Sequence, residues 1–213
     1  MKIGILGTGD VGRTLGGGFL ALGHEVMMGS RSAANEKAAA WAREAGGKAS
    51  SPSFADAAAF GEVVVLATLG SATEGILGTA GATAFEGKTV IDATNPLDFS
   101  TGAPTLYVGT IDSLGERIQK ALPGAHVVKA FNTVGHAHMF RPSFHEGRPD
   151  MFIAGDHDGA KRQVSGILET FGWGVADLGG IEGSRWLEAM CMAWVAYAFK
   201  HGTWDHAFKL LRK

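Results

Sequence analysis

The sequence is poor in the features that mark secreted, nucleic-acid-binding or membrane-spanning proteins. Its single cysteine, Cys191, excludes an internal disulfide and is compatible with a reducing compartment. A net charge of −2 provides no basic field for nucleic acid or for an anionic membrane surface. The longest apolar run, within residues 189–199, is shorter than the about 20 residues that a spanning helix needs. Because residues 2–6 already form a predicted strand, we expect no signal peptide and a cytoplasmic protein.

Motifs for hydrolytic or metal-dependent chemistry are absent as well. The sequence has no C-x-x-C motif, no recognisable catalytic triad and no pair of carboxylates at a telling spacing. His136 and His138 could bind a metal or shuttle protons, but no third ligand stands close by, so a solvated loop is the simpler interpretation. We therefore predict no metal site and keep His136, with Asn132, only as a candidate catalytic residue.

A glycine-rich turn stands directly after the first predicted strand. The apolar run "KIGIL" leads into "GTGDVG" and then into a helical segment, which is the order of a dinucleotide-binding fingerprint. Gly7 permits the tight turn, Gly9 lets the backbone approach a pyrophosphate, and Gly12 lets the helix pack closely on the strand. The alternative is a glycine-rich turn with no ligand, in a chain with 32 glycines. The predicted cofactor-binding residues here are Gly7, Thr8, Gly9, Asp10, Val11 and Gly12.

The second predicted strand ends without the acid that NAD-binding units carry at this place. An acid there would bond the ribose 2′-hydroxyl, whereas "SRS", Ser30 to Ser32, offers a guanidinium and two hydroxyls, with Lys37 shortly after. Cationic and hydroxyl groups suit a 2′-phosphate, which an acid would repel. A solvated Arg31 beside an N-capping Ser32 is the alternative. The pattern favours NADPH over NADH.

Predicted strands and helices alternate from residue 2 to about residue 178. Strands are expected at residues 2–6, 25–28, 48–49, 62–69, 89–94, 126–131, 151–154 and 174–178. Helices are expected at residues 11–22, 35–45, 54–60, 73–80, 113–122, 159–171 and 184–199, with loops at 97–110 and 132–149. This order predicts one α/β domain over residues 1–213, with a doubly wound, mostly parallel sheet and a helical extension over residues 181–213.

Ligands of open parallel sheets bind beyond the carboxyl ends of the strands. In this chain, that rule brings together the turns that follow the predicted strands, which are rich in glycine, threonine, serine and asparagine. Besides the residues already named, it assigns Ala67, Thr68, Leu69, Asn95, Pro96 and Asn132 to the cofactor cleft.

The chain resembles the family of coenzyme F420-dependent NADP oxidoreductases over nearly all of its length. The resemblance rests on "GILGTGDVG", "MGSRS", "DATNP", "VVKAFNT", "FIAGD" and "ADLGGIEGSRWLEAM". It implies a Rossmann-type domain, a homodimer, and 2′-phosphate contacts from Thr8, Ser30, Arg31 and Lys37. It also implies that Thr68, Leu69 and the turn at Asn132 lie beside the nicotinamide. Two motifs, "DATNP" and "VVKAFNT", are also similar to the cytosolic reductase domain of STEAP metalloreductases, in which NADPH reduces a flavin.

Three functions are compatible with these residues. The leading hypothesis is hydride transfer between NADP(H) and a flavin-like or deazaflavin (F420) acceptor, because a ring that takes hydride directly needs little acid–base help. The second is reduction of a small carbonyl or imine, in a pocket completed by a partner subunit. The third is a non-catalytic NADP(H) sensor. The apolar residues of 185–199 cover more than one helix face, which further favours a homodimer.

Overall fold

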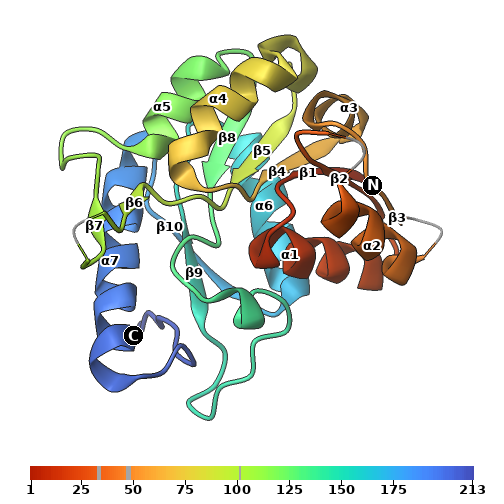
Figure 1. Ribbon diagram of the computed structural model, residues 1–213. Helices are drawn as coiled ribbons and strands as arrows, with labels where there is room; N and C mark the ends of the chain where they lie inside the picture. Colours follow the sequence, from red (N-terminus) through yellow and green to blue (C-terminus); the bar gives the residue numbers. More distant parts are fainter. Residues whose placement is uncertain (33–34, 47–48, 101) are drawn as a thin grey trace.

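The computed structural model describes residues 1–32, 35–46, 49–100 and 102–213, and omits the side chain of Lys37 (Figure 1). Its central feature is a six-stranded, wholly parallel sheet in the order β3-β2-β1-β4-β5-β8. The strands are β1 (Lys2–Leu6), β2 (Glu25–Gly29), β3 (Ala49–Ser50), β4 (Val63–Leu66), β5 (Thr89–Asp92) and β8 (His126–Lys129). From the neighbouring strands β1 and β4, later strands are added outward in opposite directions, β2 and β3 on one side and β5 and β8 on the other. This is the order of a doubly wound sheet, so the predicted doubly wound α/β fold is confirmed.

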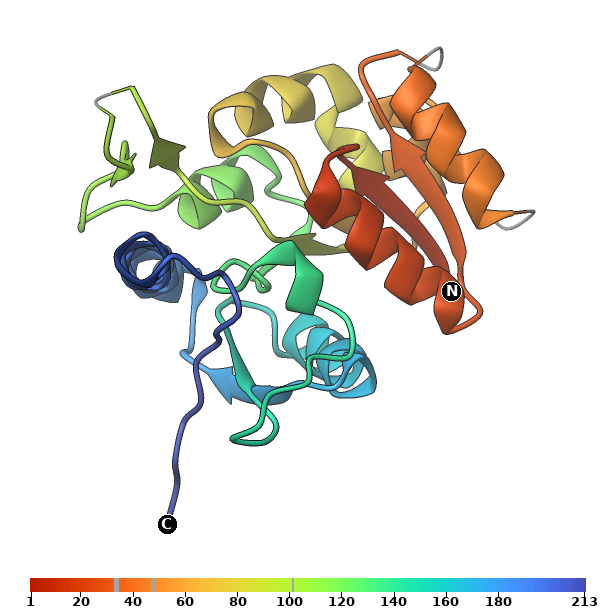
Figure 2. The ribbon, with the colours of Figure 1, turned by 60° about the horizontal axis from the view of Figure 1, so that its bottom comes forward.

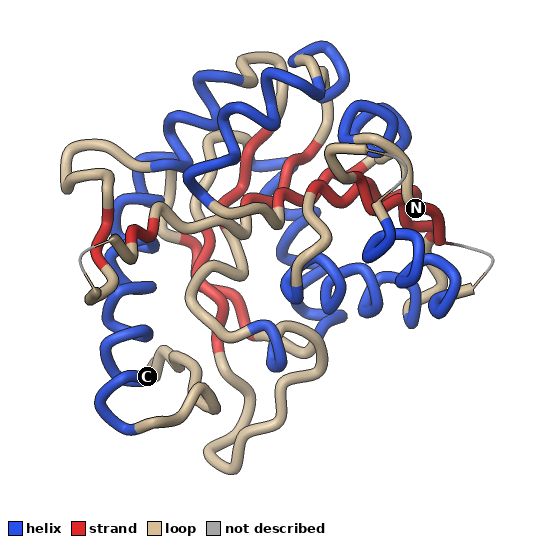
Figure 3. The backbone as a smooth tube through the Cα atoms, viewed as in Figure 1, coloured by secondary structure: helices blue, strands red, loops and turns tan. Residues whose placement is uncertain are grey.

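Helices cover both faces of this sheet (Figure 3). One face packs on α1 (Asp10–Ala21), α2 (Glu36–Ala45) and α6 (Asp158–Phe171), and the other on α3 (Phe54–Phe60), α4 (Gly70–Ala80) and α5 (Leu114–Ala121). The side chains of a strand alternate between faces, so Val63 and Val65 of β4 enter the first core while Val64 and Leu66 enter the second. Burial on both faces accounts for the continuous apolar run of β4.

Two further sheets lie beside the main one. β9 (Asp150–Ile153) and β10 (Gly174–Asp177) form a parallel pair, which meets β8 through a bridge between Lys129 and Ala154. β6 (Leu97–Asp98) and β7 (Thr105–Leu106) form an antiparallel hairpin. The sequence-based expectation of a plain loop over residues 97–110 was therefore wrong. The helix α4 begins at Gly70, after Leu69 in extended conformation, whereas the sequence predicted a start at residue 73.

The chain ends in the helix α7 (Ser184–His201) and an extended tail, which runs from α7 to the lower edge of the view in Figure 2. Three short 3-10 turns, η1 (Ala82–Phe85), η2 (His136–His138) and η3 (Ile181–Gly183), complete the elements. Tail contacts include a bond between the His138 ring and Asp205 at 2.9 Å and one from Asp150 N–H to the Phe208 carbonyl at 3.0 Å. Within the described ranges, every helix is too short or too polar to traverse a bilayer.

Candidate active site

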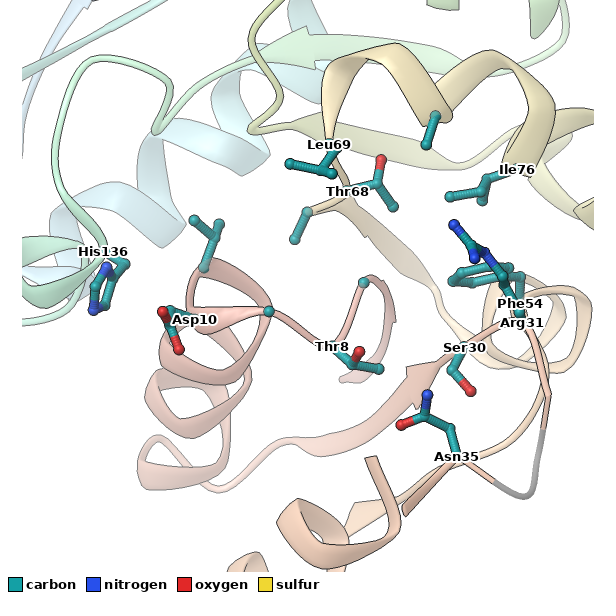
Figure 4. Close-up of a pocket in the computed structure, with 15 residues that line it drawn as sticks. Thr8, Asp10, Ser30, Arg31, Asn35, Phe54, Thr68, Leu69, Ile76 and His136 are labelled. Carbon is teal, nitrogen blue, oxygen red and sulfur yellow. The ribbon is translucent and has the colours of Figure 1, made fainter. Parts of the chain in front are cut away.

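A cavity of about 630 Å³ lies where the carboxyl ends of β1, β2 and β4 meet (Figure 4). Ten of the predicted cofactor-binding residues line it, together with the candidate His136 and four residues that the sequence did not single out. The ten are Gly7, Thr8, Gly9, Asp10, Val11, Ser30, Arg31, Ala67, Thr68 and Leu69, and the four are Asn35, Phe54, Ala72 and Ile76. The residues selected by the strand-end rule at β1, β2 and β4 thus line one cavity.

The glycine-rich turn has the shape that a pyrophosphate requires. Gly7 has a φ of +131°, and a Cβ on it would lie 2.2 Å from the Ala67 carbonyl oxygen, so no other residue fits. Gly9 by contrast faces open space, with no atom within 4 Å of an added Cβ. Gly9 also begins α1 with no side-chain cap, so the first N–H groups of the helix are available to an anion. A dinucleotide pyrophosphate fits this cradle.

Gly12 does not line the cavity. A Cβ on Gly12 would lie 2.2 Å from the Gly7 carbonyl oxygen, so its role is the close approach of α1 to the turn. Its predicted contribution to cofactor binding is therefore indirect.

The end of β2 supplies a cation and an amide rather than an acid. Arg31 is exposed and lies near Phe54 and Ile76 at the rim of the cavity (Figure 4). Asn35 caps α2, its Oδ1 accepting from Ala38 N–H at 3.0 Å, and this turns the amide nitrogen toward the cavity. These donors suit a 2′-phosphate.

Ser30 has no free hydrogen-bond donor for a 2′-phosphate, although it lies at the predicted place. Its hydroxyl donates to the Ser32 carbonyl at 2.5 Å and its N–H donates to the Pro52 carbonyl at 3.1 Å, and the residue is 3% exposed. Both protons are therefore used within the protein. Ser32 is exposed and outside the cavity lining, and the side chain of Lys37 lies outside the described residues.

A second cavity, of about 520 Å³, adjoins the first. Val11, Thr68 and Leu69 line both, so these side chains form a common wall. The rest of the second cavity comes from the start of α4, the end of β5 and the β6–β7 hairpin. Those residues are Gly70, Ser71, Ala93, Thr94, Asn95, Leu97, Asp98, Phe99 and Tyr107. The hairpin missed from the sequence thus builds an entire wall of the site.

The hydroxyl of Thr68 is oriented by its neighbour on α4. Thr73 donates its hydroxyl proton to the Leu69 carbonyl at 3.0 Å and lies 2.8 Å from the Thr68 hydroxyl. Because the proton of Thr73 is used, Thr68 must donate to Thr73. The lone pairs of the Thr68 hydroxyl can therefore accept a hydrogen bond at the common wall.

Asn132 is buried behind the second cavity and does not line it. Its amide nitrogen donates to Asn95 Oδ1 at 3.0 Å and to the Leu187 carbonyl at 2.9 Å, while the Asn95 amide donates to the Asn132 carbonyl at 2.8 Å. Asn132 Oδ1 is buried with no hydrogen-bond partner in the described part of the chain. Pro96 is buried as well. Asn132 therefore holds Asn95, which does line the second cavity.

A buried cluster of three charged side chains, Lys129, Asp92 and Glu188, holds the chain at Thr94 in place. Lys129 Nζ lies 2.8 Å from Asp92 Oδ2 and 2.8 Å from Glu188 Oε1, and it donates to the Thr94 carbonyl at 3.0 Å. Asp92 Oδ1 accepts from both the N–H and the hydroxyl of Thr94. The two carboxylates raise the pKa of Lys129 against the opposing effect of its complete burial. This cluster fixes Thr94 beside the second cavity and keeps Lys129 charged.

The described residues form no metal site beside these cavities. Across the described ranges, no group of three or more histidine, cysteine, aspartate or glutamate side chains is placed to hold a metal ion. His138, the partner of His136 in the "HAH" motif, pairs with Asp205. His136 itself lies at the end of the first cavity near Asp10 (Figure 4).

Comparison with known proteins gives a consistent result. The family described as NADP oxidoreductase, coenzyme F420-dependent, matches residues 2–96. An F420-dependent NADP reductase of Methanothermobacter marburgensis is 33% identical over 207 residues, covering 88% of each chain. The metalloreductase STEAP3 of Rattus norvegicus is 29% identical over 195 residues, and this chain spans 36% of its length.

A solved structure from Arthrobacter sp. FB24 agrees over the whole chain. It is described as a candidate F420-dependent NADP-reductase, is 39% identical, and superposes with a TM-score of 0.93 over 100% of both chains. The glycine cradle and the acid-free end of β2 have the chemistry expected of an NADP site. The chain belongs to the family of coenzyme F420-dependent NADP oxidoreductases, and it is an NADP-dependent oxidoreductase.

Proposed function

We propose that the protein transfers a hydride between NADP(H) in the first cavity and a flat flavin-like or deazaflavin (F420) ring in the second. The observation that carries this proposal is the common wall of Val11, Thr68 and Leu69 between the two cavities. NADPH supplies a hydride, two electrons with one proton, and the ring takes it up as NADP⁺ forms. Because the two cavities share these three lining residues, they meet there, and the nicotinamide and the acceptor ring would lie in direct contact at this place, as hydride transfer requires.

The chain's own residues bind and orient the dinucleotide along the first cavity. Arg31 and Asn35 hold the 2′-phosphate, and the uncapped start of α1 at Gly9 holds the pyrophosphate. This direction of binding leaves the nicotinamide at the common wall. There the lone pair of Thr68 accepts from the nicotinamide carboxamide.

The second cavity is suited to a ring rather than to a ketone. A ketone needs a proton donor as its alkoxide develops, whereas a ring acceptor delocalises the added charge. Tyr107 is the ionisable donor in this lining, and its pKa is raised, first by burial and then by the nearby Glu74 and Glu188 carboxylates. A tyrosine with a raised pKa is a poor acid. Phe99 and Tyr107 instead offer aromatic faces to a flat ligand.

The relatives support the same acceptor class. Those from Methanothermobacter are named F420-dependent NADP reductases, and the STEAP3 relative is named a metalloreductase. None of these names describes a small-carbonyl reductase.

The test is an acceptor screen followed at the NADPH absorbance, with F420, riboflavin, FMN and a panel of small aldehydes, ketones and imines. We expect oxidation of NADPH with the ring acceptors and little with the carbonyls. Turnover of a small carbonyl or imine without any ring acceptor would instead favour the second enzymatic hypothesis. Tight NADPH binding with no turnover of any acceptor would favour the sensor.

Two variants separate hydride transfer from binding. Thr68→Val is expected to lower kcat about fivefold, since a neutral hydrogen bond contributes about 1 kcal/mol, and to change the dissociation constant of NADPH less, since Arg31 and the start of α1 hold the other end of the dinucleotide. The matched control is Thr83→Val, because Thr83 is exposed and outside both cavities. Asn132→Ala is also expected to slow transfer more than it weakens NADPH binding, because its amide holds Asn95 at the second cavity.

We also propose that the protein is a homodimer that buries part of α7. Trp186 is 60% exposed and Tyr197 is 49% exposed, and both lie on α7. Isolated side chains of this size are common on surfaces, but two aromatics on one helix suit an interface.

A further inference from the structure

The histidine at the end of the first cavity stands on a rigidly held turn. His136 begins η2, and η2 packs on α1. On one side of it, Gly135 lies so close to α7 that an added Cβ would be 3.3 Å from the Trp194 ring. On the other side, Met139 is 2% exposed, and its carbonyl accepts from Trp173 Nε1 at 3.0 Å. The position of His136 is therefore fixed by its neighbours on both sides.

The ring of His136 is free to bind a ligand. It is exposed and lines the first cavity. Among the described residues, neither of its ring nitrogens has a hydrogen-bond partner. His138, two residues later, instead lies 2.9 Å from Asp205 through its Nε2. A neutral imidazole carries one N–H donor and one acceptor, so the ring of His136 can make two hydrogen bonds to a ligand in the cavity.

His136 lies at the end of the cavity opposite Arg31. Figure 4 shows Arg31 at one end, Thr8 in the middle and His136 at the other end. Where the 2′-phosphate is held at Arg31 and the pyrophosphate at the start of α1, the nicotinamide nucleotide extends beyond Gly9 toward His136. Since the nicotinamide ring itself takes the common wall, the part that faces His136 is the ribose of this nucleotide.

Asp10 makes this end of the cavity a better site for hydroxyl groups than for a phosphate. Its side chain is exposed, lines the cavity and lies beside His136 (Figure 4). A carboxylate repels a phosphate oxygen but accepts a hydrogen bond from a hydroxyl group. The 2′- and 3′-hydroxyls of a ribose each donate and accept, so they match an imidazole and a carboxylate together.

We propose that His136 binds the ribose hydroxyls of the nicotinamide nucleotide and is a determinant of affinity for that half of NADP(H). This inference rests on the proposed placement of the dinucleotide in the first cavity. It gives His136 a role in holding the cofactor rather than in proton transfer.

A fragment of the cofactor separates its two halves. Adenosine 2′,5′-bisphosphate carries the 2′-phosphate and reaches the start of α1, but it lacks the nicotinamide nucleotide. Quenching of protein fluorescence gives the dissociation constants of NADP⁺ and of this fragment. One neutral hydrogen bond corresponds to about fivefold in a dissociation constant, so His136→Leu should weaken NADP⁺ about fivefold and leave the fragment unchanged.

Three further variants complete the experiment. His136→Gln keeps one donor and one acceptor, so it should restore most of the affinity for NADP⁺. His145→Leu is the matched control and should change neither constant, because His145 is exposed in the same loop and outside the described lining of both cavities. Arg31→Ala should weaken NADP⁺ and the fragment alike.

An unchanged dissociation constant of NADP⁺ in His136→Leu would overturn the proposal. An equal loss of affinity for the fragment would do the same, because His136 would then act on the adenine half. Failure of His136→Gln to restore binding, or an effect of His136→Leu that disappears at about 0.5 M salt, would also overturn it, because the contact would then be a charged one to the pyrophosphate.

These binding constants do not depend on hydride transfer. If they change as expected but no ring acceptor oxidises NADPH, the contact of His136 stands and the proposed hydride transfer fails. If F420 or a flavin oxidises NADPH while His136→Leu binds NADP⁺ as tightly as the wild type, the transfer stands and the contact fails.

Discussion

Replacing Arg31 by alanine is expected to remove most of the preference for NADPH over NADH. Arg31 is the cation lining the described part of the 2′-phosphate end of the first cavity. A charge-assisted hydrogen bond contributes about 1.5–3 kcal/mol, and the exposure of Arg31 favours the lower value. Since about 1.4 kcal/mol corresponds to a factor of ten, the dissociation constant of NADPH should rise about tenfold while that of NADH stays unchanged.

Variants of Asn35 and Ser30 test which other side chains of this end of the cavity contribute to the preference for NADPH. Asn35→Asp keeps the oxygen that caps α2 but replaces the amide donor by a second acceptor, so NADPH should weaken while NADH holds or improves. Ser30→Ala should change the ratio less than about twofold, because the Ser30 hydroxyl already donates to the Ser32 carbonyl.

Quenching of protein fluorescence by each nucleotide gives the dissociation constants. If Arg31→Ala weakened NADPH and NADH equally, Arg31 would bind the adenine, and the assignment of the 2′-phosphate would be refuted.

Three other results are expected. Lys129→Met should lower the free energy of unfolding by about 3–5 kcal/mol, because it leaves Asp92 and Glu188 buried without their cation. Arg13→Met, in an exposed ion pair with Glu44, should cost less than about 1 kcal/mol, and urea denaturation tests both. Burial, and to a smaller extent the ring of His157 stacked at 3.8 Å, lowers the pKa of His126 in the folded protein. The unfolded chain therefore binds the proton more readily, so stability should be full above about pH 6.5 and decline as the pH falls from there through the lowered pKa, and His126→Gln should flatten that decline. Light scattering at micromolar concentration should give a dimer mass, and Trp186→Glu should give a monomer; a monomeric wild type would contradict the proposed interface.

The parts of the site that could be predicted from the sequence are those whose conformation depends on a few consecutive residues. The turn from Gly7 to Gly12 combines a strand end, a positive φ and a helix start, and each has a local cause. Arg31 follows the second strand directly, so its place in the cavity needed only the order of the strands. Both assignments could be made because backbone conformation at these positions depends on neighbours in the chain.

The parts that were missed depend on contacts between distant segments. Asn35, Phe54 and Ile76 meet in the first cavity from α2, α3 and α4, and no local pattern connects them. The β6–β7 hairpin has strands of two residues each, too short for any periodicity to appear. Asn132 was expected in the cleft, but the packing of α7 places the Leu187 carbonyl against its amide and buries it.

The buried ion pair of Asp92 and Lys129 could have been predicted from the sequence. The predicted strands "TVIDAT" and "HVVKAF" each contain a charged residue, Asp92 and Lys129, within an apolar run. A charge inside a strand buried on both faces must find an opposite charge. Adjacent parallel strands would have suggested this pair, although Glu188 comes from a helix and could not have been paired with it from spacing.

The bond between Lys129 and Glu188 ties α7 to β8, the last strand of the six-stranded sheet. Glu188 also accepts from the N–H groups of Leu114 and Gly115 at the start of α5, so one carboxylate joins three elements. Local opening of α7 alone would remove Glu188 from Lys129 and leave the buried N–H groups of Leu114 and Gly115 without their acceptor, which makes such an opening costly. The central amides of α7 should therefore exchange with deuterium as slowly as those of β5 and β8, through opening of the whole molecule.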